Sequence, residues 1–217
     1  TSLFSASGCI DRNLIKLGAQ NMCWEEEGQF TGEISPKMLM EMNLDLVMIG
    51  HSERRHIFGE TDRMCNLKVK SALDHGFIAL LCIGETMEEK NYGISDEVLR
   101  SQLKIGLHGV TKAQLPKVWI AYEPVWAIGT GGIPATPDYA EEKHKAIREC
   151  LLELYGEDGK DIPVLYGGSV NPDNAVEMIV QPSIDGLFVG RSAWNAKAFR
   201  ELIISSMDAY KRSMENS

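Results

Sequence analysis

The sequence lacks the features that would place the protein in a membrane or on nucleic acid. No apolar run approaches the roughly 18 residues that a membrane-spanning helix needs. Lysine and arginine form no cluster, and the formal net charge of the 217 residues is −9, so the basic surface typical of a nucleic-acid binder is missing. We therefore expect a soluble protein with no membrane and no nucleic-acid partner. An anionic ligand would need local help from backbone N–H groups.

Paired cysteines are also missing. The five cysteines are widely spaced, without a CxxC motif, at Cys9, Cys23, Cys65, Cys82 and Cys150. This pattern favours reduced thiols in a cytoplasmic protein over a disulfide framework or a zinc site. The chain begins at Thr1 with neither an initiator methionine nor a charged-then-apolar leader. We expect no secretory signal and a processed or truncated start.

Nothing in the sequence divides the chain into parts. It has no linker rich in proline, glycine and serine, no low-complexity segment and no sequence repeat. A length of 217 residues suits one larger domain with a substantial core. We predict a single domain over residues 1–217.

Short apolar runs recur along the chain, and helix-length patterns separate them. The six runs are Ile15–Asn21, Leu46–His51, Ile78–Gly84, Val118–Glu123, Pro163–Gly168 and Gly186–Gly190. Strands that alternate with helices at a spacing of roughly 30 residues are typical of βα units and a parallel sheet. The predicted fold class is α/β, with one βα unit for each run.

Local signals predict where several helices begin and end. Thr136–Pro137 places a capping hydroxyl before proline at the first helical position, and Asn171–Pro172 repeats this pattern. Ser95 is a further predicted cap, and Gly76 a predicted helix stop. The residues expected to face inward are Cys65, Val69, Ala72 and Leu73; Val98, Leu99, Leu103 and Leu107; Ile147, Cys150, Leu151 and Leu154; and, in the last helix, Phe199, Leu202, Ile203 and Met207.

Polar residues follow several of the predicted strands. They include Asn21, His51, Glu85 and Glu123. A single histidine here is as well explained by a structural role, and a single glutamate by an ion pair. Because the carboxyl ends of parallel strands share one edge of a sheet, their common position indicates a site. Glu123, which ends a buried run and precedes a glycine-rich loop, is the candidate base.

Two further strand ends are rich in glycine. Tyr166–Ser169 reads YGGS and Val189–Ser192 reads VGRS. Such segments present backbone N–H groups without obstruction, as phosphate binding at a helix N-terminus requires. A glycine pair alone is more often an ordinary turn, so this interpretation depends on the neighbouring strand ends.

Seven segments together match one known family, in the same order along the chain. They are GAQN at Gly18–Asn21, GQFTGEISP at Gly28–Pro36, IGHSERRHIFGE at Ile49–Glu60, CIGET at Cys82–Thr86, AYEPVWAIGTG at Ala121–Gly131, YGGSV at Tyr166–Val170 and VGRS at Val189–Ser192. On these segments the chain strongly resembles the triosephosphate isomerases. The resemblance implies a TIM (β/α)₈-type barrel, incomplete in this chain because six βα units are visible.

The resemblance also implies an activity and a set of site residues. The family interconverts dihydroxyacetone phosphate and D-glyceraldehyde 3-phosphate through an enediol, in glycolysis and gluconeogenesis, without a metal or organic cofactor. Glu123 matches the family's base and His51 its neutral electrophile, for which this family is the established example. Substrate- and phosphate-binding positions match Ile128, Gly129, Ser169, Gly190 and Arg191, and supporting positions match Glu53, Cys82 and Glu85. For Cys82 a packed thiol is an equally good interpretation.

Two further segments match elements outside the chemistry. The segment Gly28–Glu33, with Thr31 at its tip, resembles the loop through which family subunits dock, which implies a homodimer. Residues 127–136 match the mobile lid that closes over the phosphate and excludes water. This lid is one residue longer than the common family form and lacks its usual lysine.

The start of the chain departs most from the family pattern. The first βα unit and the second strand are absent, and with them an Asn-x-Lys element whose lysine binds the substrate. Asn66–Lys68 and Asn195–Lys197 have the spacing, but both fall in predicted helices, and we reject them. Glu53 loses its partner in that lysine and is expected to stay protonated or to turn to solvent. Six strands cannot close an eight-stranded barrel.

Three explanations of this start are open: the chain is part of a longer molecule, it is truncated and has little or no activity, or a rearranged dimer restores closure. A smaller departure is Arg191, which stands where the family has glycine. Our main hypothesis is triosephosphate isomerase. The alternatives are an isomerase of a related sugar phosphate such as erythrulose phosphate, and a catalytically inactive barrel fragment.

Overall fold

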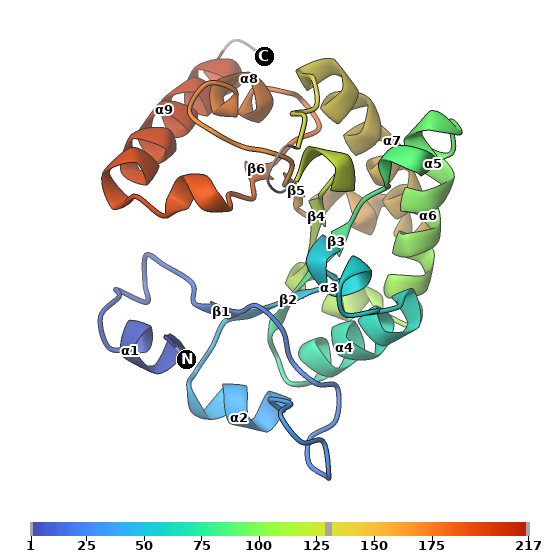
Figure 1. The fold of residues 1–217 in the computed structure, drawn as a ribbon, viewed down its shortest axis with the longest axis vertical. Helices are drawn as coiled ribbons and strands as arrows, with labels where there is room; N and C mark the ends of the chain where they lie inside the picture. Colours follow the sequence, from blue (N-terminus) through green and yellow to red (C-terminus); the bar gives the residue numbers. More distant parts are fainter. Residues whose placement is uncertain (1, 129–131, 216–217) are drawn as a thin grey trace. The chain divides into compact units, whose positions relative to one another are not determined.

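The computed structural model describes residues 2–128 and 132–215, in which six strands alternate with helices along the chain (Figure 1). By their contacts the residues group into two compact units. The first consists of Thr1–Cys82 and Gln102–Trp119, and the second of Ile83–Ser101 and Ile120–Ser217. The boundaries between these ranges fall inside β3, α6 and β4.

The first unit is built on three parallel strands. β1 pairs with β2 from Gly18 opposite Leu46, and β2 pairs with β3 from Leu46 opposite Ile78. Its elements are α1 (Leu3–Ser7), β1 (Gly18–Ala19), α2 (Pro36–Glu41), β2 (Leu46–Ile49), α3 (Ser52–His56), α4 (Asp62–Asp74), β3 (Ile78–Ile83) and η1 (Lys112–Lys117). The loop between β1 and α2 extends away from the sheet of this unit (Figure 1).

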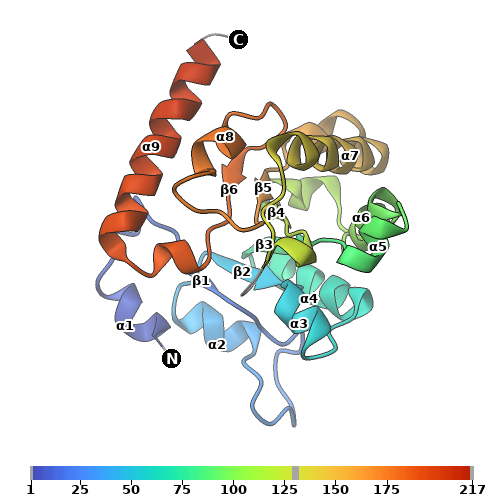
Figure 2. The same ribbon diagram turned by 45° about the horizontal axis from the view of Figure 1, so that its top comes forward.

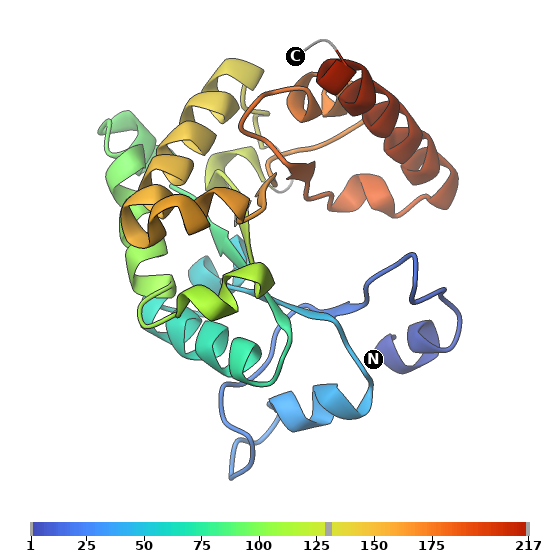
Figure 3. The ribbon, with the colours of Figure 1, turned by 180° about the vertical axis from the view of Figure 1, so that it is seen from behind.

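Helix α4 forms as its sequence predicts. The Thr61 hydroxyl accepts a hydrogen bond from the Met64 N–H at 3.3 Å, which caps the first turn. Cys65, Val69 and Ala72 are fully buried on the face that lies along β2 (Figure 3). Gly76 has a φ of 80°, the left-handed conformation that ends a helix at little cost in glycine. The predicted face and stop are therefore confirmed.

The second unit repeats the same construction. β4 pairs with β5 in parallel, with Ile120 opposite Val164, and β5 pairs with β6, with Leu165 opposite Gly186. Its elements are α5 (Met87–Asn91), α6 (Ser95–Gly106), β4 (Val118–Tyr122), η2 (Val125–Ala127), α7 (Pro137–Tyr155), η3 (Gly156–Asp161), β5 (Val164–Tyr166), α8 (Ala175–Ile179), β6 (Gly186–Leu187), η4 (Arg191–Ala193) and α9 (Ala196–Glu215). Parallel strands within each unit confirm the α/β fold class.

The start of α7 is as predicted, but its apolar face ends differently. Thr136 accepts from the Tyr139 N–H at 3.3 Å, and Pro137 is the first helical residue. Ile147, Cys150 and Leu151 are fully buried. The prediction for Leu154 was wrong, since this side chain is exposed and Tyr155 is buried in its place. Tyr155 follows Leu151 by one helical turn and so continues the buried stripe.

Asn171–Pro172 does not start a helix, and this prediction was also wrong. The Asn171 side chain accepts from the Asp173 N–H at 2.8 Å, and the Asn174 side chain accepts from the Asn171 N–H at 2.9 Å. With the Ala175 N–H donating to the Asn171 carbonyl at 3.0 Å, these local bonds form a turn that leads into the helix. Helix α8 begins at Ala175 instead. The predicted cap Ser95 likewise differs slightly, because it is the first residue of α6.

Helix α9 buries a narrower face than predicted. Leu202, Ser206 and Ala209 are buried, on the helix that packs beside α8 (Figure 2). Ile203 and Met207, predicted to face inward, are 40% and 53% exposed. Together with residues of β6 and α8 they line an open cavity of about 340 Å³.

In the described part of the chain, no helix combines the length and apolarity that a membrane span requires.

Candidate active site

The main chain holds Glu123 in place at the carboxyl end of β4. Its N–H donates to the Ile83 carbonyl at 2.7 Å, and the Val125 N–H donates to the Glu85 carbonyl at 2.9 Å. These two bonds tie Glu123 and Val125, which follow β4, to Ile83 and Glu85 at the end of β3 and just after it. The residue is only 2% exposed, as its position at the end of a buried run predicts.

Two glycines leave the space that Glu123 occupies. A Cβ atom on Gly84 would lie 1.8 Å from the Glu123 carbonyl oxygen, which no side chain tolerates. A Cβ atom on Gly167 would lie 2.9 Å from the Glu123 Cγ atom. Gly167 also donates its N–H to the Tyr122 carbonyl at 2.7 Å. Glycine at these strand ends allows the close backbone approach that fixes the carboxylate.

A second carboxylate, Glu85, lies fully buried beside this segment and accepts hydrogen bonds from aromatic side chains. The Tyr122 hydroxyl donates to it at 3.1 Å, the Trp126 indole N–H at 2.9 Å and the Tyr139 hydroxyl at 2.8 Å. Burial raises the pKa of Tyr139 to about 12 and that of Tyr122 well above its usual value. Both phenols therefore keep their protons at neutral pH and act as donors.

In the first unit, His51 lies between β2 and α3 and caps the helix. Its Nδ1 atom accepts a hydrogen bond from the Glu53 N–H at 3.3 Å, and the ring is 19% exposed. A ring nitrogen that accepts a backbone N–H carries no proton of its own. The neutral ring therefore bears its proton on Nε2, which is the atom able to donate to a substrate oxygen.

Arg55, for which no role was predicted, binds the carbonyl of the residue before His51. Its guanidinium donates to the Gly50 carbonyl at 2.7 Å and to the Cys82 carbonyl at 3.1 Å, and it pairs with Asp62 at 2.5 Å. It therefore joins the ends of β2 and β3 to the start of α4. Its place in the run HSERR was the available signal, but a run of charges is equally typical of an exposed helix.

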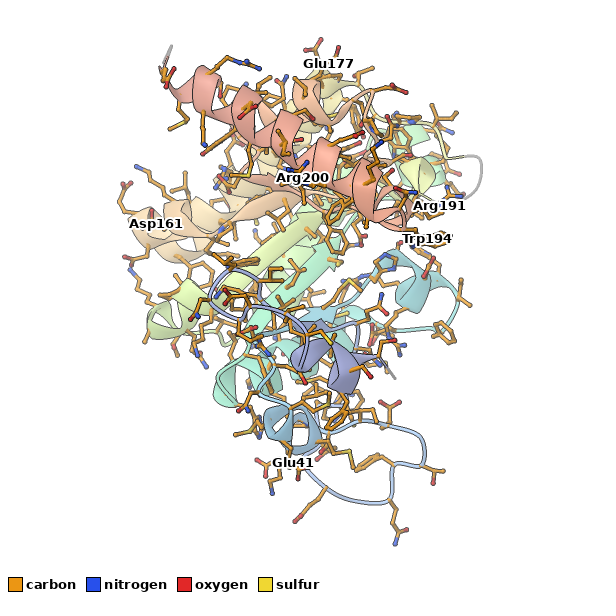
Figure 4. All side chains as sticks on the ribbon, turned by 90° about the vertical axis from the view of Figure 1, so that its left-hand side faces the viewer. Glu41, Asp161, Glu177, Arg191, Trp194 and Arg200 are labelled. Carbon is orange, nitrogen blue, oxygen red and sulfur yellow. The ribbon has the colours of Figure 1, made fainter. Side chains whose placement is uncertain are left out.

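The two glycine-rich loops of the second unit are joined to each other. The Ser192 hydroxyl donates to the Val170 carbonyl at 2.8 Å, and the Ser169 carbonyl accepts from the Asn174 amide at 2.8 Å. Gly190 is exposed, and a Cβ atom there would meet nothing within 4 Å. Arg191 is also exposed and lies one turn before Trp194, ahead of α9 (Figure 4). Ser169, Gly190 and Arg191 thus belong to one joined pair of loops.

The remaining predicted positions divide between the units. Ile128 is partly exposed at the end of η2, whereas Gly129 lies outside the described residues. Cys82 is fully buried in β3. The Glu53 side chain is 65% exposed, as expected if it turns to solvent, with Oε2 3.8 Å from His51 Nδ1. Thr31 and Glu33 are exposed on the loop between β1 and α2.

Comparison with known proteins decides the family. A family model described as triosephosphate isomerase matches residues 1–206. The chain belongs to the triosephosphate isomerase family. Its α/β fold with six strands is therefore part of a TIM-type barrel, as the motifs predicted, and the family is one of sugar-phosphate isomerases.

Relatives in this family carry two different names. A protein named L-erythrulose-1-phosphate isomerase from Rhizobium etli is 50% identical over 98% of this chain and 79% of its own length. One of the same name from Rhizobium meliloti is 50% identical over 87% of this chain and 73% of its length. A triosephosphate isomerase from Dictyoglomus turgidum is 47% identical over 94% and 82%.

Proposed function

We propose that the protein isomerises a four-carbon sugar phosphate, L-erythrulose-1-phosphate, by proton transfer through an enediol. The observation that carries the chemistry is Glu123, a carboxylate held by main-chain bonds at a strand end between two glycines. The substrate rests on the two relatives of that name at 50% identity. The four-carbon substrate was the alternative drawn from the sequence, and we place it ahead of the main hypothesis, triosephosphate isomerase.

The two substrate candidates share their reacting atoms. In dihydroxyacetone phosphate the carbonyl carbon lies between a carbon that bears phosphate and a carbon that bears a hydroxyl. L-Erythrulose-1-phosphate has the same arrangement, with a hydroxymethyl group in place of one hydrogen on the hydroxyl-bearing carbon. The same base can therefore serve both, and the four-carbon substrate needs only additional space next to the reacting carbon.

In the proposed reaction Glu123 removes the proton from the hydroxyl-bearing carbon. The electron pair of that C–H bond forms the carbon–carbon double bond of the enediol, and the carbonyl oxygen takes a proton at the His51 Nε2 side. Glu123 then returns the proton to the former carbonyl carbon. The hydroxyl on the other carbon gives its proton back to His51 Nε2, which had donated one to the first oxygen, and becomes the new carbonyl. With the triose this product is an aldose, whereas with the four-carbon substrate it is a second ketose. No oxidant, metal or organic cofactor enters this balance.

The phosphate is proposed to bind at the joined glycine-rich loops. Main-chain N–H groups near Ser169 and Gly190 are the proposed donors. Ile128 and Gly129 are proposed as further phosphate-binding positions from the family motif alone. Arg191 adds a positive charge beside them. Because the net charge of the chain is −9, an anionic substrate is attracted only where positive charge is present locally. Glu53, Cys82 and Glu85 are proposed as supporting residues.

Triosephosphate isomerisation remains the second candidate, favoured by the relative from Dictyoglomus turgidum at 47% identity. Measured kcat/KM values on the two substrates separate the candidates, since a pocket that fits one extra carbon group discriminates by about 10-fold to 200-fold. A ratio in favour of the triose would reverse our assignment. Turnover of neither substrate by the purified protein would support the inactive alternative.

We further propose a homodimer and a cytoplasmic location.

The base is tested by Glu123→Gln, with exposed Glu88→Gln as the matched control. We expect kcat to fall by roughly 10²-fold to 10⁴-fold with a small change in KM, because general-base catalysis is lost while binding remains. Exchange of the substrate's carbon-bound hydrogen with deuterated water, followed by NMR, should stop as well. Unchanged exchange in Glu123→Gln would contradict the assignment.

A further inference from the structure

Around Glu85 the second unit holds a cluster of a cation and two aromatic rings, which we name the Glu85 brace: Lys90, Trp126 and Tyr139. The Lys90 ammonium lies 3.5 Å from the Trp126 ring centre and 4.4 Å from that of Tyr139. The two rings meet edge to face, with centroids 5.5 Å apart. Each residue comes from a different element, namely α5, η2 and α7.

The number of hydrogens on each group determines which partner donates in the hydrogen bonds around Glu85. Tyr139 has one hydroxyl hydrogen, and the Glu85 carboxylate 2.8 Å away can only accept it. The Ser95 hydroxyl, 3.2 Å from the Tyr139 oxygen, must then be the donor in that second bond. The Trp126 indole can only donate, and it does so to the same Glu85 oxygen at 2.9 Å. The carboxylate is thus the common acceptor.

Lys90 places a positive charge close to both rings. A cation over an aromatic face is attracted by the ring's electrons and draws negative charge away from the N–H and O–H edges. Those edges point at the Glu85 carboxylate. Lys143, 5.3 Å from the Tyr139 ring centre, adds a second cation and is itself held by Asp96 at 2.7 Å.

The brace acts on the segment that carries the base. Trp126 comes three residues after Glu123, in η2, which is only three residues long. The Trp126 carbonyl also accepts from the Ile133 N–H at 3.2 Å. So short a helix has few bonds of its own, and the indole contact adds to the main-chain bonds of Glu123 and Val125 that hold the segment.

We propose, on the basis of the function proposed above, that Tyr139 and Lys90 are positioning residues, which hold the Trp126 indole on Glu85 and so keep the segment after Glu123 in its productive position. In this role they act through the Trp126 indole and not on the substrate. Their effect therefore passes through Trp126 and should appear in kcat more than in KM.

The inference is tested with Tyr139→Phe and Lys90→Met. We expect kcat to fall by roughly 10-fold to 100-fold, with KM changed less than about 3-fold, because a small displacement near a base costs rate more than affinity. Lys90→Arg, which keeps the cation, should restore most of kcat. Tyr92→Phe is the matched control, since this tyrosine is 71% exposed and its hydroxyl donates to Glu88 at 3.2 Å.

A second readout does not depend on turnover. The Trp126 indole N–H resonance, identified by its loss in Trp126→Phe, should move upfield and exchange faster with water in Tyr139→Phe and Lys90→Met. An unmoved resonance in both variants would overturn the inference, and so would a moved resonance with kcat unchanged. If the unmodified protein turns over neither substrate, the proposed function and the positioning role fail together, while a moved resonance would still establish the contact.

Discussion

At the scale of single residues, the room left by Gly167 decides where the Glu123 side chain can lie. The Cβ atom of Gly167→Ala would come within 2.9 Å of both Glu123 Cγ and Phe188 Cδ1. We expect the Glu123 side chain to move away from the added methyl group. The resulting fall in kcat should be about 10-fold to 100-fold. Steady-state kinetics measures it, and Gly8→Ala, where the nearest atom is 3.9 Å from the new Cβ, is the control.

His144 makes the stability of the fold depend on pH. Its fully buried imidazole packs against the Tyr122 and Tyr166 rings, and this burial lowers its pKa from 6.5 to about 4. Below pH 6.5 the unfolded chain binds a proton that the folded protein does not take up. The contribution of His144 is therefore complete above pH 6.5 and is lost towards pH 4, by up to about 3 kcal/mol.

Urea unfolding at pH 7.5, 6 and 5 measures this dependence. His144→Gln should remove the part of the acid destabilisation that arises from the imidazole. His108→Gln, a change at an exposed histidine, should leave it. The same pH slope in all three proteins would contradict the assignment.

At the scale of elements, a buried ion pair joins α4 to the segments around it. The Lys68 ammonium pairs with Glu60 and donates to the Asn21 side chain at 2.7 Å, after β1. Lys68 and Glu60 are 2% and 4% exposed. Their mutual neutralisation allows two charges to lie in the core.

Lys68→Met should lower the free energy of unfolding by up to about 3 kcal/mol, because the buried Glu60 carboxylate would lose its nearest cation and keep Arg54, 3.4 Å away, as its partner. Urea unfolding measures the loss. Adding Glu60→Gln should recover part of it, since the charge is then removed. Lys145→Met, which breaks a pair whose lysine side chain is 63% exposed, should cost less than about 1 kcal/mol.

The elements also show what the sequence could predict. Thr136, Gly76 and the buried strands obey local rules, and these predictions were confirmed. The helix start predicted at Asn171–Pro172 was wrong because the Asx hydrogen bonds there form a turn ahead of α8, and a cap pattern alone does not reveal how long that turn is. Leu154 and Ile203 were misread because an apolar residue at helical spacing does not reveal how wide the buried face is.

The candidate site was predictable to a different degree. The motifs identified Glu123, His51 and the glycine-rich loops, because these residue types are tied to chemistry. Arg55, Trp126 and Tyr139 received no role, since their contacts join elements far apart in the sequence. Such contacts depend on three-dimensional packing and leave no local pattern.

At the scale of the whole molecule, the loop between β1 and α2 is the predicted contact with a second copy. It is closed by the Cys23 N–H donating to the Ile34 carbonyl at 2.8 Å and presents Thr31 and Glu33 to solvent. We expect sedimentation velocity to give a dimer that dissociates on dilution. Thr31→Arg should shift it to monomer without changing the circular dichroism, whereas Glu97→Arg on α6 should not. A monomer at all concentrations would refute the dimer.

The way Glu123 is held bears on how substrates change during evolution. Its position depends on main-chain bonds at the ends of β3 and β4 and on Gly84, where any other residue would collide with it. Ser169, Gly190 and Arg191, which are proposed to bind the phosphate, lie instead on loops after β5 and β6. Drift in those loops can alter substrate preference while the reacting carboxylate stays where it is. Laboratory evolution toward a new sugar phosphate should accordingly accumulate its mutations in the loops and leave Gly84 unchanged.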